Sequence, residues 1–272
     1  MSIDKETLAQ MYFSNDVPCP LTLKCGYTLH ITPVKVKDWA IFSNSLSIIT
    51  INKNRIDNVE ILSKSYLDFL FGIINGIYDI GLNSDCSYLL TYVLFYSLGV
   101  DYHKIVKDEN GRSVLCLCKE DGTIYATITS KEFDDLKEII LFQNLIDYDD
   151  RYIDPDVEEL RNDYYRIKYR DRKTPTFEEK RTYVMAKCGF TAEQINDMTY
   201  RAFSQIYQHA IDDVLFIGEK IIQGSYKYKV DKDITHPLYT KKKDEYEELF
   251  TNAETLASKG ISGTEQLTAM GM

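Results

Sequence analysis

The hydrophobic residues of this chain follow a helical period in the stretch that ends at Gly99 and a strand period from Asp101 to Thr129, and this change constrains the fold most. Apolar residues recur three or four apart before Gly99, as on a helix face, and at every second position afterwards, as on a strand face. The alternating segments are Asp101–Val106, Ser113–Cys118 and Thr123–Thr129. Polar clusters ending in Gly111 and Gly122 separate them, as hairpin turns do. The chain is therefore predicted to form a three-stranded antiparallel meander.

Shorter signals predict the elements around this meander. Leu21–Lys24 and Tyr27–Thr32 are expected to pair as a hairpin across Cys25 and Gly26. Helices are predicted over 38–49, 65–80, 86–98 and 131–145, with Asp38, Ser63 or Ser65, Asp85 and Ser130 as their expected N-caps. Acidic and Asn residues break the apolar region 66–100 into pieces shorter than the roughly 20 residues of a membrane span. We therefore interpret that region as two buried helices.

Capping residues divide the second half of the chain into three further helices. The predicted helices cover 155–169, 177–188 and 192–224. Thr176 begins the second helix and Gly189 ends it, while Thr191 and Gln194 form a T-x-x-Q capping box at the start of the third. This third helix is expected to run unbroken. Its apolar residues form one seam at helical spacing: Ile195, Met198, Ala202, Ile206, Ala210, Val214, Ile217 and Ile221.

These elements predict an α+β chain, with an N-terminal unit of helices and small antiparallel sheets followed by an all-α C-terminal region. The expected boundaries are an α+β domain over 1–146, a charged helical connector over 147–176, a helical domain over 177–250 and a mobile tail over 251–272.

Composition narrows the class of partner. The 272 residues carry a formal net charge of −10, and 44% of them are hydrophobic, which is enough for a substantial core. An acidic chain is a poor general binder of phosphate backbones, because Lys and Arg supply most of that affinity. No secretory leader is evident at the N-terminus, so the six cysteines are expected to be free thiols in a reducing compartment. Cys116 and Cys118 are interpreted as buried apolar residues.

The sequence contains no pattern typical of an enzyme, a cofactor site or a metal site. It has no phosphate-binding loop, dinucleotide fingerprint, nucleophile elbow or zinc-protease motif. Its four histidines lie in separate elements without a second His at metal-ligand spacing. Adjacent acidic pairs such as Asp212-Asp213 point about 100° apart on a helix and do not form one site. We predict no catalytic, cofactor-binding or metal-binding residues.

The segment 177–224 has the outline of a helix-turn-helix, which raises DNA binding as an alternative. A recognition helix places Arg, Lys, Asn or Gln early on its exposed face. Here those positions hold Glu193, Gln194, Asn196 and Asp197, of which two are carboxylates. Protein packing is therefore the favoured interpretation of this segment, and nucleic-acid binding is disfavoured.

The run GFTAEQINDMTYRAF, Gly189–Phe203, resembles the C-terminal helical region of a phage family. The family is the tail assembly chaperones, and related tail-cluster proteins, of long-tailed phages that infect low-GC Gram-positive bacteria. The matching positions are Gly189, Thr191, Glu193, Ile195, Met198, Thr199, Tyr200, Arg201 and Phe203. Two further segments, Ile31–Phe42 and His236–Phe250, are also similar to this family.

The resemblance implies a non-enzymatic protein of the host cytoplasm that covers the tape measure protein and recruits tail tube protein. It implies neither a membrane nor a cofactor, and it leaves homo-oligomerisation open. The expected partner-binding residues are Ile195, Met198, Ala202, Ile206, Val214 and Ile217. Two alternatives remain: a structural tail or baseplate component of the virion, and a nucleic-acid-binding protein that uses 177–224.

Overall fold

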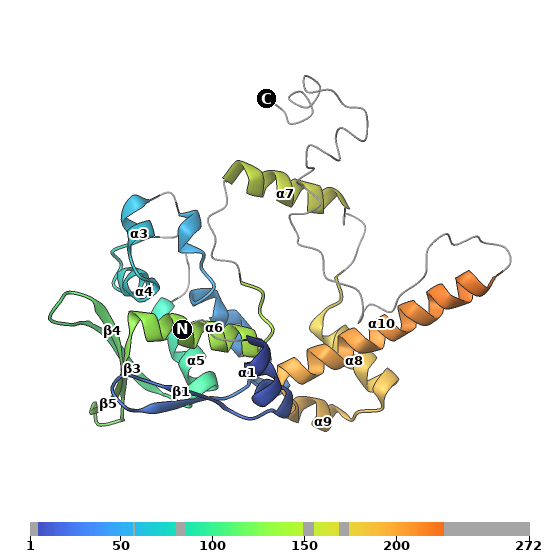
Figure 1. The fold of residues 1–272 in the computed structure, drawn as a ribbon, viewed down its shortest axis with the longest axis horizontal. Coiled ribbons are helices and arrows are strands. Elements are labelled where there is room, and N and C mark those ends of the chain that lie inside the picture. The colour runs from blue at the N-terminus through green and yellow to red at the C-terminus, as the bar shows by residue number, and fades with distance from the viewer. Residues whose placement is uncertain (1–4, 57, 80–84, 149–154, 169–173, 226–272) are drawn as a thin grey trace, which may run out of the picture. The chain divides into compact units, whose positions relative to one another are not determined.

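A computed structural model describes residues 5–56, 58–79, 85–148, 155–168 and 174–225. The fold is α+β, as predicted, with two small antiparallel sheets and a larger number of helices (Figure 1). The chain divides into two compact units, one of 1–155 with 173–210 and the other of 156–172 with 211–272. The expected domain boundaries at 146/147 and 176/177 do not coincide with these units. Residues 226–250 of the expected helical domain and the expected tail 251–272 lie outside the described residues.

The three-stranded sheet of the first unit has the predicted meander order β3-β4-β5. Its strands are β3 (Tyr102–Lys107), β4 (Ser113–Cys118) and β5 (Ile124–Thr129). Gly111 and Gly122 have φ values of 72° and 81°, which a turn position tolerates best with glycine. In β4, Leu115 and Leu117 enter the main core. Cys116 and Cys118 alternate with them and are also buried, as predicted, so both faces of the central strand are covered.

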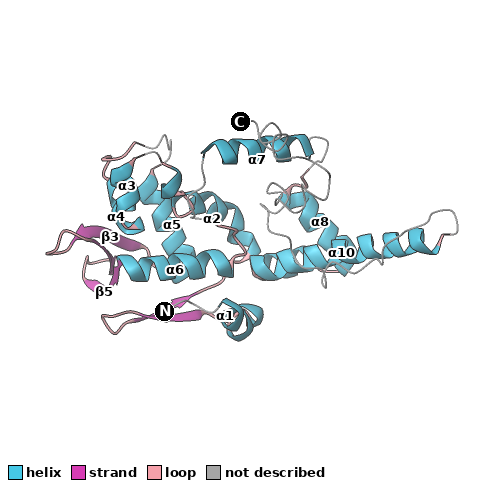
Figure 2. Ribbon diagram, turned by 45° about the horizontal axis from the view of Figure 1, so that its top comes forward, coloured by secondary structure: helices cyan, strands magenta, loops and turns pink. Residues whose placement is uncertain are grey.

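Helices α4 (Tyr66–Ile74) and α6 (Ser130–Gln143) contact this sheet and each other. Figure 2 shows them gathered with α5 (Cys86–Leu98) beside the strands. The predicted capping holds for α5, because the Asp85 carboxylate accepts hydrogen bonds from the amides of Ser87 and Tyr88. The cap of α6 is corrected by one residue: Thr129, not Ser130, forms a capping box with Glu132.

The second sheet is the predicted hairpin, with the shorter strands β1 (Cys19–Thr22) and β2 (Thr28–Ile31). Strand β2 contacts α5, which in turn contacts α2 (Trp39–Ser45). The helix predicted over 38–49 is interrupted, since α2 ends at Ser45 and a 3-10 turn, Leu46–Ile48, follows it. The helix predicted over 65–80 ends at Ile74, and Gly76 adopts a φ of 68° just after it. The other short elements are α1 (Lys5–Met11), α3 (Val59–Ser63) and 3-10 turns at Phe13–Asn15, Val36–Asp38 and Lys53–Arg55.

The helices of the second half confirm two predictions and correct a third. Thr176 forms a capping box with Glu179 at the start of α8 (Phe177–Cys188), and Gly189 ends that helix with a φ of 74°. The predicted unbroken helix 192–224 is wrong. It is two helices, α9 (Ala192–Asp197) and α10 (Tyr200–Gly224), separated by an extended segment. In the second unit, α7 (Pro155–Lys168) agrees with the predicted helix 155–169 to within a residue.

Candidate functional site

The break between α9 and α10 is produced by a backbone contact with a distant part of the chain. Thr199 forms an isolated antiparallel bridge with Lys35. The Met198 carbonyl accepts a hydrogen bond of 3.0 Å from the amide of Val36, and the Tyr200 amide donates one of 2.8 Å to the Val34 carbonyl. A helix has no free backbone groups for such a bridge. Met198 and Thr199 therefore leave the helix, and together with the Tyr200 amide they attach α9 and the start of α10 to the N-terminal part of the first unit.

Side chains of the same short run strengthen this attachment. The Thr199 hydroxyl donates to Asp16 Oδ1 at 2.8 Å and accepts from the Ala202 amide at 3.2 Å, so it also caps α10. The Tyr200 ring stacks on Trp39 with an interplanar angle of 3°. These contacts explain why Trp39 and Tyr200 are only partly exposed despite their positions at the start of helices.

Arg201 is the buried charge of this region, with 7% of its surface exposed. Its Nη1 donates to the Phe142 carbonyl at 2.8 Å, and its guanidinium lies 5.4 Å and 5.3 Å from the ring centroids of Phe13 and Phe142. Burial lowers the pKa of Arg201, but an arginine starts so high that the side chain stays charged at neutral pH. Arg201 therefore holds the start of α10 against the end of α6.

The predicted seam divides into an internal part and an exposed part. Ile195 and Phe203 are fully buried with Val36 and Val184, and Met198 and Ile206 pack against that cluster. Ala202 is half-buried. These positions hold the first unit together. Val214 and Ile217 behave differently, with 44% and 56% of their surfaces exposed. Of the six predicted partner-binding residues, only these two are presented to solvent.

The exposed part belongs to a wider apolar surface on the second-unit portion of α10. At about 100° per residue, seven positions fall within an arc of roughly 160°. This surface, the apolar arc, consists of Ile211, Val214, Leu215, Ile217, Gly218, Ile221 and Ile222. Five of its side chains are 44–68% exposed. Sequence reasoning missed Leu215 and Ile222, although plotting every residue by its angle around the helix would have found them.

Carboxylates border the apolar arc on both sides. By the same helical angle, Asp213 lies beyond one edge and Glu219 beyond the other, and both residues are exposed. In α7, Leu160 and Ile167 are likewise 65% and 74% exposed on one helix face. The described helices of the second unit thus carry apolar faces that the described residues do not bury.

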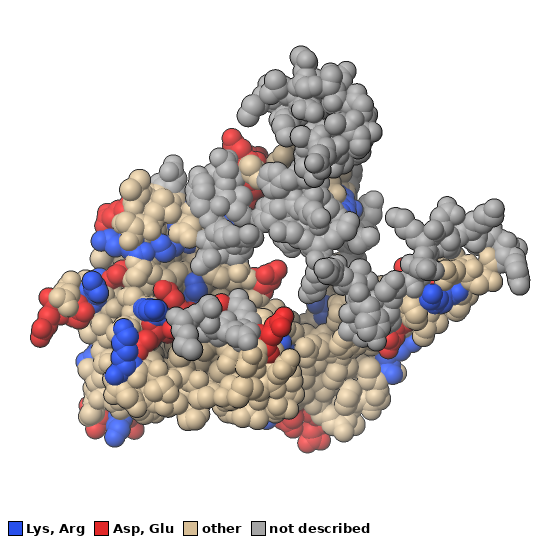
Figure 3. All heavy atoms as spheres, viewed as in Figure 1, with Lys and Arg blue, Asp and Glu red and all other residues tan. Residues whose placement is uncertain are grey.

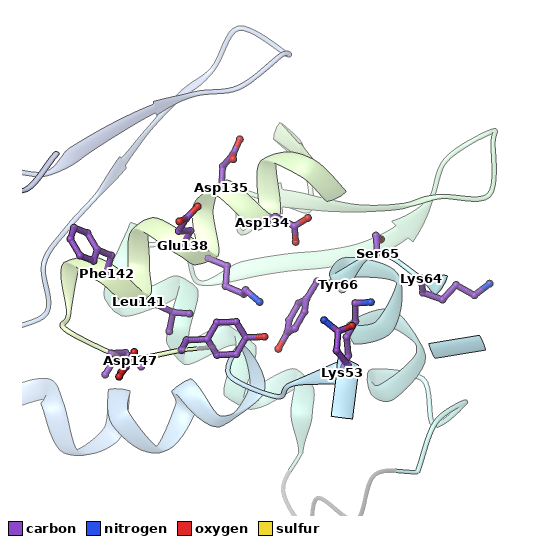
Figure 4. Close-up of a pocket in the computed structure, with 14 residues that line it drawn as sticks. Lys53, Lys64, Ser65, Tyr66, Asp134, Asp135, Glu138, Leu141, Phe142 and Asp147 are labelled. Carbon is purple, nitrogen blue, oxygen red and sulfur yellow. The ribbon is translucent and has the colours of Figure 1, made fainter. Parts of the chain in front are cut away.

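A hollow of about 670 Å³ in the first unit is a candidate small-molecule site. Figure 4 shows Asp134, Asp135 and Glu138 on α6 along one side, with Tyr66 opposite. The ammonium of Lys137 lies 3.6 Å and 4.2 Å from the ring centroids of Tyr66 and Tyr148, so the chain itself fills this aromatic cage.

The hydroxyl groups that line this hollow bond to other groups of the chain. Burial raises the pKa of Tyr66, and its hydroxyl donates to backbone carbonyls, including that of Ile48 at 3.1 Å. The Ser65 hydroxyl donates to Asp68 at 2.7 Å, and no histidine lines the hollow to act as its base. The described lining therefore offers charges of both signs but no activated nucleophile.

The remaining predictions concern metals, histidines and DNA. Among the residues that the structure describes, no group of three or more His, Cys, Asp or Glu could hold a metal ion, and no helix is long and apolar enough to cross a membrane. His30 and His209 are exposed in separate elements, while His103 is half-buried, and burial lowers the pKa of its imidazole. His236 lies outside the described residues. The early positions of the supposed recognition helix, Glu193 to Asp197, lie in α9. This helix has only 6 residues, and its Asp197 pairs with Lys37 at 3.8 Å.

Comparisons with known proteins add no relative: no protein-family model, no curated protein and no solved structure matches this chain.

Proposed function

We propose that this chain is a non-enzymatic assembly chaperone of a phage tail, which binds apolar helices of the tape measure protein in the host cytoplasm. The observation that carries the proposal is the apolar arc of α10, where five large aliphatic side chains are 44–68% exposed. Exposed apolar surfaces of this kind mark sites of protein interaction. The resemblance of Gly189–Phe203 to tail assembly chaperones supports the same class of function.

The shape of the arc fits a helical partner. Its residues recur three and four apart, which matches the spacing that one helix presents to another. Asp213 and Glu219 border it, so a partner helix with Lys or Arg beside its apolar stripe is the best electrostatic match. The proposed occupant is therefore a basic amphipathic helix of the tape measure protein.

The size of the arc favours reversible binding. Burying a Val, Leu or Ile side chain completely contributes about 1.5–3 kcal/mol, so covering the exposed half of five contributes about 5 kcal/mol. Association itself costs on the order of 4–15 kcal/mol. One arc thus binds one helix weakly. Several copies along one long partner would bind it more firmly and still release it when the tail tube polymerises.

Co-expression of the full chain with tape measure fragments from the same phage genome tests this proposal. The wild-type chain should co-purify with fragments that contain amphipathic helices. The double substitution I217E and I221E should abolish co-purification without lowering the free energy of unfolding, because both side chains are already exposed. The control is Val59→Glu, which places one such charge at an 81% exposed apolar residue of α3 and should bind as the wild type does.

The alternatives predict other outcomes. Failure of the wild-type chain to bind any fragment, together with stoichiometric amounts of it in purified particles, would support a structural virion component and overturn the chaperone proposal. Salt-dependent retention on DNA would support the nucleic-acid alternative.

A further inference from the structure

Helix α5 carries an exposed face without any charge. None of its 13 residues is charged, whereas charged residues make up 27% of the whole chain. Tyr88 and Phe95 are 59% and 43% exposed, although an apolar helix of this composition was expected to be buried on all sides. The expectation of two buried helices is therefore corrected for α5: Leu90, Val93 and Leu94 face the core, and the opposite side faces solvent.

The exposed side of α5, here the tyrosine face, is an ordered aromatic surface. It consists of Tyr88, Thr91, Tyr92 and Phe95, which recur three or four apart. The rings of Tyr88 and Tyr92 meet edge to face at 4.8 Å, and their hydroxyls are 3.1 Å apart. Tyr96 continues the row, stacking on Tyr92 at 6.2 Å and meeting Phe42 of α2 at 6.3 Å. Contacts along the helix thus hold the rings in place before any partner binds.

The neighbouring helix, α2, also has no charged residue. Helix α2 contacts α5, and the segment 39–52 that contains it has no charged residue. The outward side chains of α2 include Ala40, Ile41 and Asn44. Two adjacent helices of an acidic chain therefore both lack charged side chains. Figure 3 shows that Lys, Arg, Asp and Glu side chains are otherwise spread over one face of the chain.

We propose that the tyrosine face binds the same face of a second copy of this chain. In a symmetric dimer each patch meets itself, so any charge within it would face an identical charge. With a net charge of −10, an uncharged face allows two copies to approach with the least repulsion. The polar groups of the face are the hydroxyls of Tyr88, Thr91 and Tyr92. Thr91 donates to the Ser87 carbonyl and Tyr92 donates to Tyr88, so across a dimer the Tyr88 hydroxyl can donate to a hydroxyl oxygen of the other copy, and the hydroxyl oxygens can accept. The face is therefore chemically complementary to itself.

The surface area that the tyrosine face can bury limits the affinity of the dimer. A stable interface buries about 800 Å² on each partner. An aromatic side chain buries about 150–250 Å² when fully covered, so the partly exposed rings of α5 supply less than that area. The dimer is accordingly weak, and it forms at micromolar or higher protein concentration rather than at nanomolar concentration.

Sedimentation of the full chain over a range of concentrations tests this inference. The wild-type chain should shift from monomer to dimer as concentration rises, and Phe95→Glu should weaken this association roughly tenfold or more by placing like charges opposite each other. Val59→Glu should leave the association unchanged, because Val59 is also an exposed apolar residue, at 81%, but lies on α3. Circular dichroism of each variant shows whether it remains folded.

A charge-swap pair makes the test specific. A mixture of Phe95→Glu and Phe95→Lys chains should associate more tightly than either variant does alone, since opposite charges then meet across the interface. A wild-type chain that stays monomeric at millimolar concentration would overturn the inference. So would a dimer that Phe95→Glu leaves intact or that only I217E and I221E disrupt, because the dimer would then use another surface.

Discussion

At the scale of single residues, buried polar groups form hydrogen bonds between distant segments, and sequence patterns do not reveal these bonds. Arg201 and Thr199 were recognised in the sequence only as positions of a resemblance. In the structure, Arg201 bonds the Phe142 carbonyl and Thr199 bonds Asp16, which is 183 positions away in the chain. Helical spacing predicts which side chains share a face, but it carries no information about contacts between distant segments. Capping residues such as Asp85 and Thr176 were predictable because their partners lie within three positions.

Asp68 allows a prediction at this scale. Burial alone would raise the pKa of its carboxyl, but hydrogen bonds from Lys107, Ser65 and Ser113 hold that pKa well below its usual range. Lys107 Nζ approaches at 2.7 Å, and the Ser113 amide and hydroxyl donate at 2.9 Å and 2.7 Å. Asp68→Asn should therefore lower the free energy of unfolding by about 1–2 kcal/mol at pH 7.

The pH dependence of this difference follows from the lowered pKa. The stabilisation is complete above the unfolded-state pKa of about 4 and is lost as pH falls toward the folded-state value. Urea unfolding should show a constant difference between wild type and Asp68→Asn from pH 5 to pH 7, and a smaller one at pH 3. Asp101→Asn, on an exposed residue, is the control. A difference that is as large at pH 3 as at pH 7 would contradict this explanation.

At the scale of elements, the sequence predicted the strands and most helices but not the break in the last long one. The meander and the hairpin follow from alternation and turn glycines, which are local signals. The residues 192–224 show helical spacing throughout, yet Met198 and Thr199 interrupt the helix because the backbone there pairs with Val34–Val36. A non-local backbone pairing overrides local propensity here. The internal residues of the seam lie on both sides of the break, and its exposed residues begin only at Val214.

The cap of α10 supplies the prediction at this scale. Thr199→Val keeps the shape of the side chain but removes its hydrogen bonds to Asp16 and to the Ala202 amide. The free energy of unfolding should fall by about 1–2 kcal/mol, as for the loss of a helix cap. Thr32→Val, on an exposed threonine, is the matched control and should change the free energy by less than about 0.5 kcal/mol. Equal stability of the two variants would show that the cap does not hold α10.

At the scale of the whole molecule, the α+β class was predictable and the grouping of helices was not. Helices α8 and α9 belong to the unit that contains both sheets, because Val36 packs with Val184 and Ile195 in one cluster. The sequence placed a boundary at 176/177, since a charged, polar stretch precedes Thr176. The candidate site was predictable in part. Helical spacing identified Val214 and Ile217, but only the packing of the structure shows that Ile195 and Ile206 are internal.

The most direct test of the proposed function is amide hydrogen exchange of the full chain, measured alone and with a bound tape measure fragment. A helix that becomes covered by a partner opens less often, so its amides exchange more slowly. We predict slower exchange across 211–224, where the apolar arc lies, and unchanged exchange across α5. A complex in which 211–224 exchanges as fast as in the free chain, with the slowing elsewhere, would contradict the assignment of the arc as the partner-binding surface.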